Sequence, residues 1–150
     1  MARIIAVCRS ETKGIRKENI GCGIFKENYG LEDDAHSDYA THRQVSLLAV
    51  ESINKMRETG LKLVPGDFAE NLTTEGLNLP ALPVGTMLSV GEEVLLEVTQ
   101  IGKECHTGCA IFKQVGKCIM PKEGIFARVI RGGEIKENDS INVESSANTN

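Results

Sequence analysis

Two short apolar runs on either side of Gly91-Glu92 constrain the fold of this chain most strongly. The first run covers residues 84–90, with Val, Met and Leu, and the second covers 93–101, with Val, Leu and Ile. Runs of this length and composition around a glycine-containing turn predict a β-hairpin. Cys105 follows shortly after the second run. The hairpin therefore predicts a thiol near the end of a strand, where a rigid scaffold often positions reactive residues.

Further strands are predicted along the rest of the chain. They cover residues 3–8, 21–26, 44–48 and 67–76, with a final strand pair over 134–143 around an Asn-Asp turn. Many short strands, few helices and 15 glycines favour a mainly β, barrel-like domain of the α+β class. We expect this domain to span 1–144 and the polar residues 145–150 to form a disordered tail.

Two helices are predicted beside these strands. The first covers residues 50–59, where apolar residues recur at helical spacing opposite charged ones, and Ser46 is a candidate N-cap. The second covers residues 124–133, with Ile125 and Val129 on its inner face. A strand is the alternative for the second segment, because Val and Ile are frequent in it.

Composition excludes several classes of function. The chain has 150 residues and a net charge of −4, so no electrostatic footprint for nucleic acid is present. No apolar run approaches the roughly 20 residues of a membrane helix. The apolar run near the N-terminus is too short for the core of a secretory signal. These features predict a cytoplasmic protein.

The chain has five cysteines, which are expected to be reduced in the cytoplasm. Cys8 lies in an apolar strand pattern and is predicted to be buried and inert. Cys22, between two glycines, fits either a buried or an exposed position. Cys105, Cys109 and Cys118, with His106, offer four potential zinc ligands. The second closely spaced pair of a structural zinc site is missing, so zinc is disfavoured.

Cys105 is the candidate reactive thiol. Sulfur transfer needs a thiolate, and adjacent cations lower a thiol pKa from its usual value of about 8.5. Lys103 and His106 flank Cys105 and are candidate supporting residues. Cys109 is a further one, because it could resolve a Cys105 persulfide by exchange. The alternative for Cys105 is a plain buried cysteine, and for Cys109 a core position.

Five blocks resemble the signature of the MOSC domain, the C-terminal domain of molybdenum-cofactor sulfurases. They are residues 30–36, 42–48, 65–76, 103–105 and 124–129, and the resemblance extends from roughly residue 3 to residue 143. It implies a mostly β, barrel-like fold. It also implies that Cys105 is the family cysteine that binds sulfur or the molybdenum of a pterin cofactor.

One departure from the family pattern lies at Asp33, where the family usually has a glycine. A glycine permits a positive φ, and Asp pays a modest penalty there, although it tolerates this region better than most residues.

Polar residues in these blocks are candidates to bind the cofactor, molybdopterin, either stably or transiently. They are His36, His42, Arg43, Asp67, Glu70, Asn71, Thr73 and Arg128. Arg43 and Arg128 are the candidates for the phosphate, because a guanidinium grips phosphate in a bidentate way. Turn capping is the alternative for Asp67 and Asn71, and a solvated loop is the alternative for the histidines.

The resemblance implies a small sulfur carrier, with sulfurtransferase-type activity as its enzymatic form. In this role Cys105 accepts persulfide sulfur from a cysteine desulfurase or another donor and delivers it to a molybdenum cofactor or another metal–sulfur centre, with proteins of the molybdenum-cofactor pathway as partners. The chain has no aminotransferase-like desulfurase portion, so no bound pyridoxal phosphate is expected. Two alternatives stay open. One is a molybdenum oxidoreductase that reduces N-hydroxylated compounds with Cys105 as the molybdenum ligand, and the other is a non-catalytic pterin- or partner-binding module.

Overall fold

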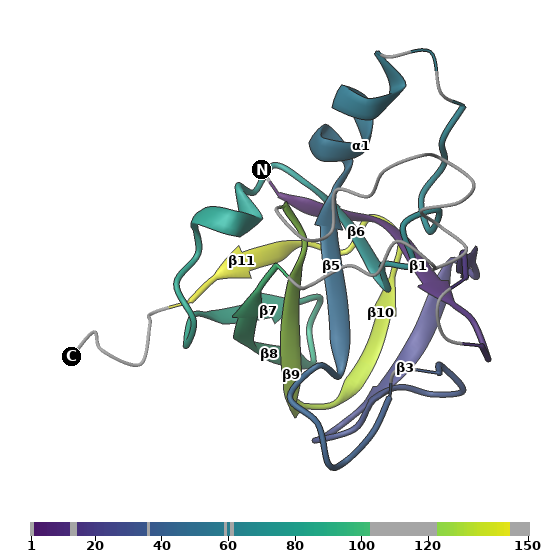
Figure 1. The fold of residues 1–150 in the computed structure, drawn as a ribbon. Helices are drawn as coiled ribbons and strands as arrows, with labels where there is room; N and C mark the ends of the chain where they lie inside the picture. Colours follow the sequence, from purple (N-terminus) through teal and green to yellow (C-terminus); the bar gives the residue numbers. More distant parts are fainter. Residues whose placement is uncertain are drawn as a thin grey trace.

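The computed structural model of the protein describes residues 2–12, 15–35, 37–58, 60, 62–102 and 123–144. Within these ranges the chain forms eleven strands, one α-helix (α1, Val50–Arg57) and one short 3₁₀ helix (η1, Leu79–Ala81). Figure 1 shows α1 beyond the upper end of β5. The predicted mainly β class is therefore confirmed. None of the described helices is long and apolar enough to cross a membrane. The predicted tail over 145–150 lies outside the described residues.

Most of the strands belong to one strongly curled sheet that forms half of a barrel. In the described part of the chain its order is β11 (Ile141–Val143), β7 (Met87–Val90), β8 (Val94–Ile101), β9 (Ile125–Arg131), β5 (Val45–Ala49), β6 (Leu72–Glu75), β1 (Arg3–Arg9) and β2 (Glu18–Asn19). A smaller sheet, β10 (Gly133–Lys136), β3 (Cys22–Lys26) and β4 (Gly30–Leu31), packs against β1, β8 and β9. The β5–β6 pair is parallel, and the other pairs are antiparallel.

Two hydrophobic clusters lie on opposite faces of the main sheet. The larger one fills the half-barrel and includes Leu47 of β5 and Ala127 of β9. The smaller one lies under α1 and includes the next residue along β5, Leu48, and Phe126 of β9. Successive strand residues point to opposite faces, so β5 and β9 contribute to both clusters. These two strands are consequently apolar without the alternation of a half-exposed strand.

The predicted helix over 124–133 is wrong, and the strand alternative is correct. Ile125 and Val129 fit a helical spacing, but with Ala127 they also fit the two-residue period of a strand that faces the larger cluster. Phe126 is buried on the other face. Burial on both faces removes the polar alternation that would have identified β9 as a strand.

Further details differ from the predictions. The strand predicted over 67–76 is limited to β6, Leu72–Glu75, because the chain forms turns over 65–68. Ser46 does not cap α1, because it lies within β5; the N-cap residue is Ala49, which makes no side-chain capping hydrogen bond. β10 and β11 pair with β3 and β7 rather than with each other. Asn138, with φ of 74°, turns the chain between them and donates its N–H to the Ile4 carbonyl. This contact directs the two strands to different sheets.

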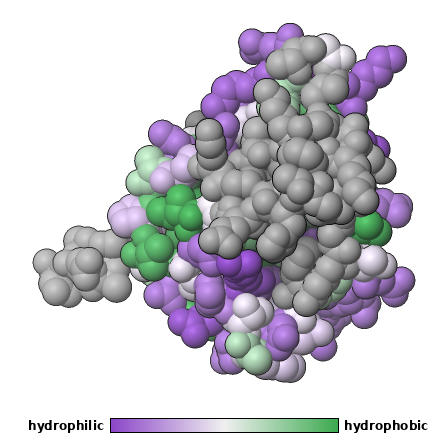
Figure 2. Space-filling view, viewed as in Figure 1, coloured by the Kyte–Doolittle hydropathy of each residue, from purple (hydrophilic) through white to green (hydrophobic). Residues whose placement is uncertain are grey.

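The hairpin and the helix over 50–59 are confirmed. β7 and β8 pair in antiparallel register from Met87–Glu97 to Val90–Val94. The second strand, β8, runs to Ile101 and ends four residues before Cys105. The exposed surface around the lower rim in Figure 2 is mainly hydrophilic, with a small hydrophobic area on the side where β7 and β11 lie.

Candidate functional site

The candidate reactive segment begins and ends at one place in the fold. Gly102 follows β8, and its N–H donates to the Gly124 carbonyl, just before β9, at 2.7 Å. Residues 103–122 between these two points lie outside the described residues, and so do Lys103, Cys105, His106, Cys109 and Cys118. His36 also lies outside them. The roles predicted for these side chains stay predictions, but their attachment to the barrel is defined.

Gln100 organises the side chains around this attachment point. Its Oε1 accepts hydrogen bonds from Arg43 Nε at 2.9 Å and from His42 Nε2 at 2.8 Å, and its Nε2 donates to the Gly102 carbonyl at 2.7 Å. An amide oxygen can only accept, so Nε2 of His42 carries a proton. Gln100 therefore joins two predicted cofactor-binding residues to Gly102, the last described residue before Cys105.

An irregularity in β8 brings Gln100 to this position. The register with β9 shifts between Val98 and Gln100, and Gln100 lies opposite Phe126. In a regular strand Gln100 would face the barrel interior with Val98, since residues two apart share a face. Such irregularities often re-aim a side chain next to a functional site.

Arg43 is fixed from a second direction by an aromatic ring. Its guanidinium carbon lies 5.5 Å from the centroid of Phe126, within the range of a cation–π interaction. Phe126 is itself buried under α1. Arg43 and His42 remain exposed. The result is a pair of donors held in a defined position and open to solvent.

Helix α1 holds the other end of the segment. Glu123 accepts a hydrogen bond from Ser52 Oγ at 2.6 Å, and its carboxylate lies 2.8 Å from Lys55 Nζ. Both partners belong to α1. The segment that contains Cys105 is thus attached to β8 and Gln100 at its start, and to α1 and β9 at its end.

The polar block over 67–74 is buried, whereas His42 and Arg43 at Gln100 are exposed. Glu70 is fully buried, and its carboxylate accepts hydrogen bonds from Gly66 N–H, Phe68 N–H and Thr73 Oγ1 at 2.8, 3.2 and 2.8 Å. Burial raises the pKa of Glu70 above its ordinary value of 4.5, against the lowering effect of these donors. Asp67 accepts from Val64 N–H at 3.0 Å.

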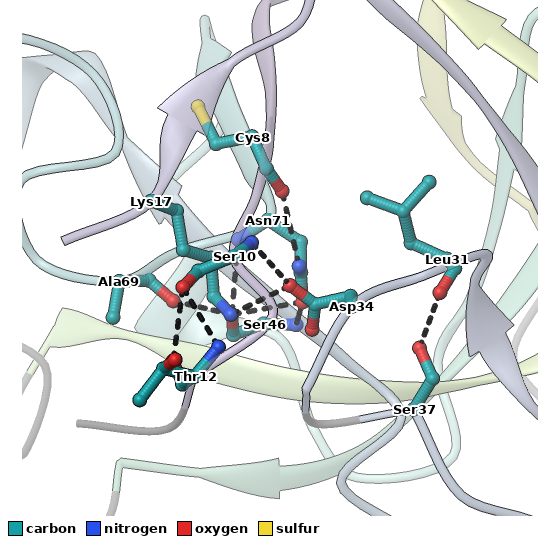
Figure 3. A network of polar contacts seen from close by, with 10 residues as sticks. All are labelled: Cys8, Ser10, Thr12, Lys17, Leu31, Asp34, Ser37, Ser46, Ala69 and Asn71. Atoms are coloured by element: carbon teal, nitrogen blue, oxygen red, sulfur yellow. Dashed lines mark hydrogen bonds and ion pairs between the residues drawn. The ribbon is translucent and has the colours of Figure 1, made fainter. Parts of the chain in front are cut away.

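Asn71 connects three strands inside the protein (Figure 3). Its Oδ1 accepts from the N–H of Ser46 in β5 at 3.0 Å, and its Nδ2 donates to the carbonyl of Cys8 in β1 at 3.1 Å. Asn71 itself directly precedes β6. Asn71 therefore uses its side-chain amide to link β1 and β5 beside β6, whereas Glu70 and Thr73 bond within the polar block itself.

The structure separates the predicted cofactor-binding residues into groups. His42 and Arg43 meet at Gln100, whereas Asp67, Glu70, Asn71 and Thr73 form the buried block. Arg128 lies on the face of β9 that carries Phe126, with a 3.4 Å contact to Glu97 of β8. Sequence reasoning missed Gln100 and Phe126. The signal was weak, because only the register shift in β8 gives Gln100 its position.

The described cysteines contrast with one another. Cys8 is buried, as predicted, and burial raises its thiol pKa far above the ordinary value, so the thiol stays protonated. Cys22 is exposed. Among the residues with described positions, no group of three or more His, Cys, Asp or Glu side chains could hold a metal ion.

Comparison with known proteins identifies the fold and the family. The YuaD protein of Bacillus subtilis is 17% identical, with a TM-score of 0.81 and 97% of both chains covered. YiiM of Geobacillus stearothermophilus is 20% identical, with a TM-score of 0.73 over 97% of this chain and 76% of its own. YiiM of Escherichia coli is 21% identical, with a TM-score of 0.66 over 95% and 70%. At these identities the likeness shows the fold alone.

No protein with a curated description matches the chain. The sequence model of the MOSC domain, in contrast, matches residues 34–142, which is well over half of the chain. This match includes the segment with Cys105 and the residues that surround its attachment to the barrel. The protein belongs to the MOSC domain family.

Proposed function

We propose that Cys105 accepts a persulfide sulfur from a separate donor, such as a cysteine desulfurase, and delivers it to a molybdenum cofactor or another metal–sulfur centre. One observation carries the proposal most. His42 and Arg43 are held by Gln100 beside Gly102, and Cys105 follows Gly102 by three residues. Membership of the MOSC domain family supports the choice of this cysteine.

The short chain between Gly102 and Cys105 limits how far the thiol can lie from Arg43. Three residues of chain span at most about 11 Å. The screening length at physiological ionic strength is about 8 Å. Arg43 is permanently charged, and a nearby positive charge lowers a thiol pKa and increases the thiolate fraction near neutrality.

The proposed loading step is a thiolate–persulfide exchange. The Cys105 thiolate attacks the outer sulfur of the donor persulfide, and a new S–S bond forms as the donor's S–S bond breaks. The donor leaves as a thiolate, and the proton of the transferred SH group stays with it or passes to solvent. This loading step needs no external oxidant or reductant, because sulfur is transferred at its existing oxidation level. Delivery as sulfide to a metal centre takes two electrons, which an added reductant supplies while Cys105 returns to the thiol.

The donors at the attachment point fit the anionic part of a molybdenum cofactor. Arg43 bonds Gln100 through Nε, and in the described part of the chain its two terminal nitrogens make no hydrogen bond. Those two nitrogens form the fork that matches a phosphate. The cofactor, when bound, would supply the molybdenum centre that receives sulfur. Arg43 would hold its phosphate, and His42 would add a second donor or acceptor at Nδ1. The cytoplasmic setting and the partners predicted from sequence remain part of this proposal.

Sulfur loading tests the proposal. The protein is incubated with a cysteine desulfurase and cysteine, and its intact mass is measured before and after treatment with a reductant. We expect one reducible sulfur on the wild type and on Cys22→Ala, which removes an exposed thiol elsewhere, and none on Cys105→Ala. An unchanged adduct on Cys105→Ala would overturn the proposal. Tightly bound molybdenum at one atom per chain, without sulfur loading, would favour the oxidoreductase instead.

A further inference from the structure

A cavity lies near the ends of β1 and β2, apart from the residues that the sulfur proposal uses. Its volume is about 550 Å³, and its lining includes Arg9, Ser10, Ile15, Arg16 and Glu18. Pockets of roughly 300–1,000 Å³ suit small molecules. The lining comes from three short segments: the end of β1 with the loop after it, the residues that lead into and follow β2, and the loop at Asp33.

A buried ion pair holds these segments together beneath the cavity. Lys17 Nζ lies 2.7 Å from Asp34 Oδ1, and both side chains are fully buried. The same carboxylate accepts a hydrogen bond from Ser10 N–H at 3.1 Å, and Ala35 N–H donates to the Ser10 carbonyl at 2.7 Å. Figure 3 shows Ser10, Lys17 and Asp34 converging.

The position of the Lys17–Asp34 pair gives a better reason for its presence than a gain in protein stability does. A buried ion pair carries a large desolvation cost and is weak evidence for stabilisation. Here it fixes residues adjacent to the cavity lining, because Arg16 and Glu18 flank Lys17 and Asp33 precedes Asp34. The walls of the cavity are therefore preorganised.

Two arginines on the lining are not committed to close partners. Arg9 lies 3.9 Å from Asp33, and Arg16 lies 3.7 Å from Asp67. Charge-assisted hydrogen bonds are shorter, at about 2.7–2.9 Å. Within the described ranges, neither guanidinium makes a hydrogen bond, and both are partly exposed. Two open guanidinium groups beside one cavity match a phosphate or a carboxylate.

The other lining residues define what must accompany the anion. Glu11, Glu18 and Asp33 are also on the lining, and Ile15 and Ile20 add apolar surface. Carboxylates accept hydrogen bonds and oppose a simple anion. A fitting ligand therefore has N–H donors on the body that carries its anionic group. The net charge of −4 makes diffuse anion attraction a poor explanation for any binding observed here.

We propose that this cavity binds a small molecule that carries a phosphate or a carboxylate together with N–H donors. A pterin with an acidic side chain and a zwitterionic phosphorylated amino acid both have this chemistry. The described lining residues of this cavity do not include those that hold the segment with Cys105. Failure of sulfur loading would leave it intact, and failure of ligand binding would leave the sulfur proposal intact.

Calorimetric titration of the full chain tests this site. The probes are inorganic phosphate for the anion alone, pterin-6-carboxylate for the heterocyclic source and O-phospho-L-serine for the amino-acid source. The variants are Arg9→Gln, Arg16→Gln and Glu18→Gln. Arg131→Gln, on β9 and outside the cavity lining, is the matched control. Thermal melting of each variant confirms that it is folded.

We expect saturable binding of at least one N–H-bearing probe, tighter than that of inorganic phosphate. Arg9→Gln and Arg16→Gln should each weaken it tenfold or more, Glu18→Gln should weaken it several-fold, and Arg131→Gln should leave it unchanged. The probe that binds more tightly identifies the source of the ligand. Absence of saturable binding for all three probes, or equal affinity in the wild type and the arginine variants, would overturn the proposal.

Discussion

Asp33 has the backbone conformation that the sequence comparison suggested. Its φ is +66°, in the region where the family usually has a glycine. Asp and Asn tolerate this region better than other side chains, and β-branched residues tolerate it least. The loop after β4 therefore has a left-handed backbone at the position where the resemblance implies a glycine. It also keeps Asp34 in place for Lys17.

Substitutions at position 33 should follow this backbone requirement. We expect Asp33→Gly to change the free energy of unfolding by less than about 0.5 kcal/mol, because the Asp33–Arg9 contact is long and exposed. Asp33→Val should lower it by about 1–2 kcal/mol, since it forces a β-branched residue to a positive φ. Urea unfolding provides the measurement, with Glu32→Val as the control at a neighbouring position without positive φ. Equal stabilities for the two position-33 variants would contradict this explanation.

Glu70 makes the free energy of unfolding depend on pH. A carboxyl whose pKa is raised on folding binds its proton more tightly in the folded state. Its contribution to the free energy of unfolding therefore falls as pH rises from the unfolded pKa towards the raised folded value. The window begins at the ordinary value of 4.5.

Glu70→Gln removes this titration and keeps the side-chain shape. We expect the variant to gain stability relative to the wild type as pH rises above 4.5, because only the wild type must bury a charge or keep a proton. Urea unfolding of both proteins near pH 4.5 and near neutrality measures the difference. A difference that does not change with pH would show that Glu70 has the same pKa in both states.

The polar residues of the sequence include both exposed candidate ligand-binding residues and buried structural residues, and polarity alone does not distinguish them. His42, Arg43, Glu70 and Asn71 all look like ligand-binding residues in the sequence. In the fold, the first two are exposed at Gln100, and the last two are buried between strands. A buried polar side chain needs a partner, and the partners of Asn71 come from distant positions, such as Ser46 and Cys8. Those distances in sequence were not predictable from the local pattern.

At the level of elements, β8 and its bulge define the candidate site. The hairpin and the position of β8 before Cys105 were predictable, because turn chemistry and β-branched runs are local signals. The register shift at Gln100 was not, because it depends on pairing with β9. The strand β9 was itself predicted as a helix, since burial on both faces hides its period. The parallel pairing of β5 and β6 likewise has no local signature.

Replacing Gln100 should change the reactivity of Cys105. Gln100→Leu removes the acceptor that holds Arg43 and His42. If the Arg43 charge favours the Cys105 thiolate, loss of its anchor should raise the pKa of the thiol and slow its alkylation by iodoacetamide near neutral pH several-fold. Peptide-resolved mass spectrometry measures the rate at each cysteine separately. Ser89→Ala, which removes a hydroxyl on β7 at a distance from this site, is the control.

An unchanged alkylation rate of Cys105 in Gln100→Leu would show that Arg43 and His42 do not influence the thiol. The exposed Cys22 gives an internal reference in the same sample, and its rate should not change in either variant. A parallel loss at both cysteines would instead indicate a general change in the fold.

At the level of the whole molecule, the half-barrel and the helix-covered face share their central strands. Leu47 and Leu48 are neighbours in β5, yet they belong to different hydrophobic clusters. Loss of one cluster exposes one face of strands that the other cluster requires. The described part of the chain should therefore unfold as one cooperative unit.

Substitutions in the two clusters test this cooperativity. Leu96→Ala, in the larger cluster, should cost about 3 kcal/mol, and Met56→Ala, under α1, should cost about 2 kcal/mol. In both variants, far-ultraviolet circular dichroism of the strands and near-ultraviolet signal from the Tyr29–Tyr39 pair, whose rings lie in tilted contact, should report the same transition. Separate transitions in Met56→Ala would show that the α1 cluster unfolds independently of the barrel.

The most direct test of the central claim follows one sulfur atom through the protein. The chain is loaded by a desulfurase from cysteine that contains isotopically heavy sulfur, the donor is removed, and an acceptor carrying a molybdenum cofactor is added. We predict that the heavy sulfur appears first on the peptide containing Cys105 and then leaves it as the acceptor gains the label. Heavy sulfur that never appears on Cys105, or that stays there while the acceptor gains label at the same rate as with Cys105→Ala, would contradict the account.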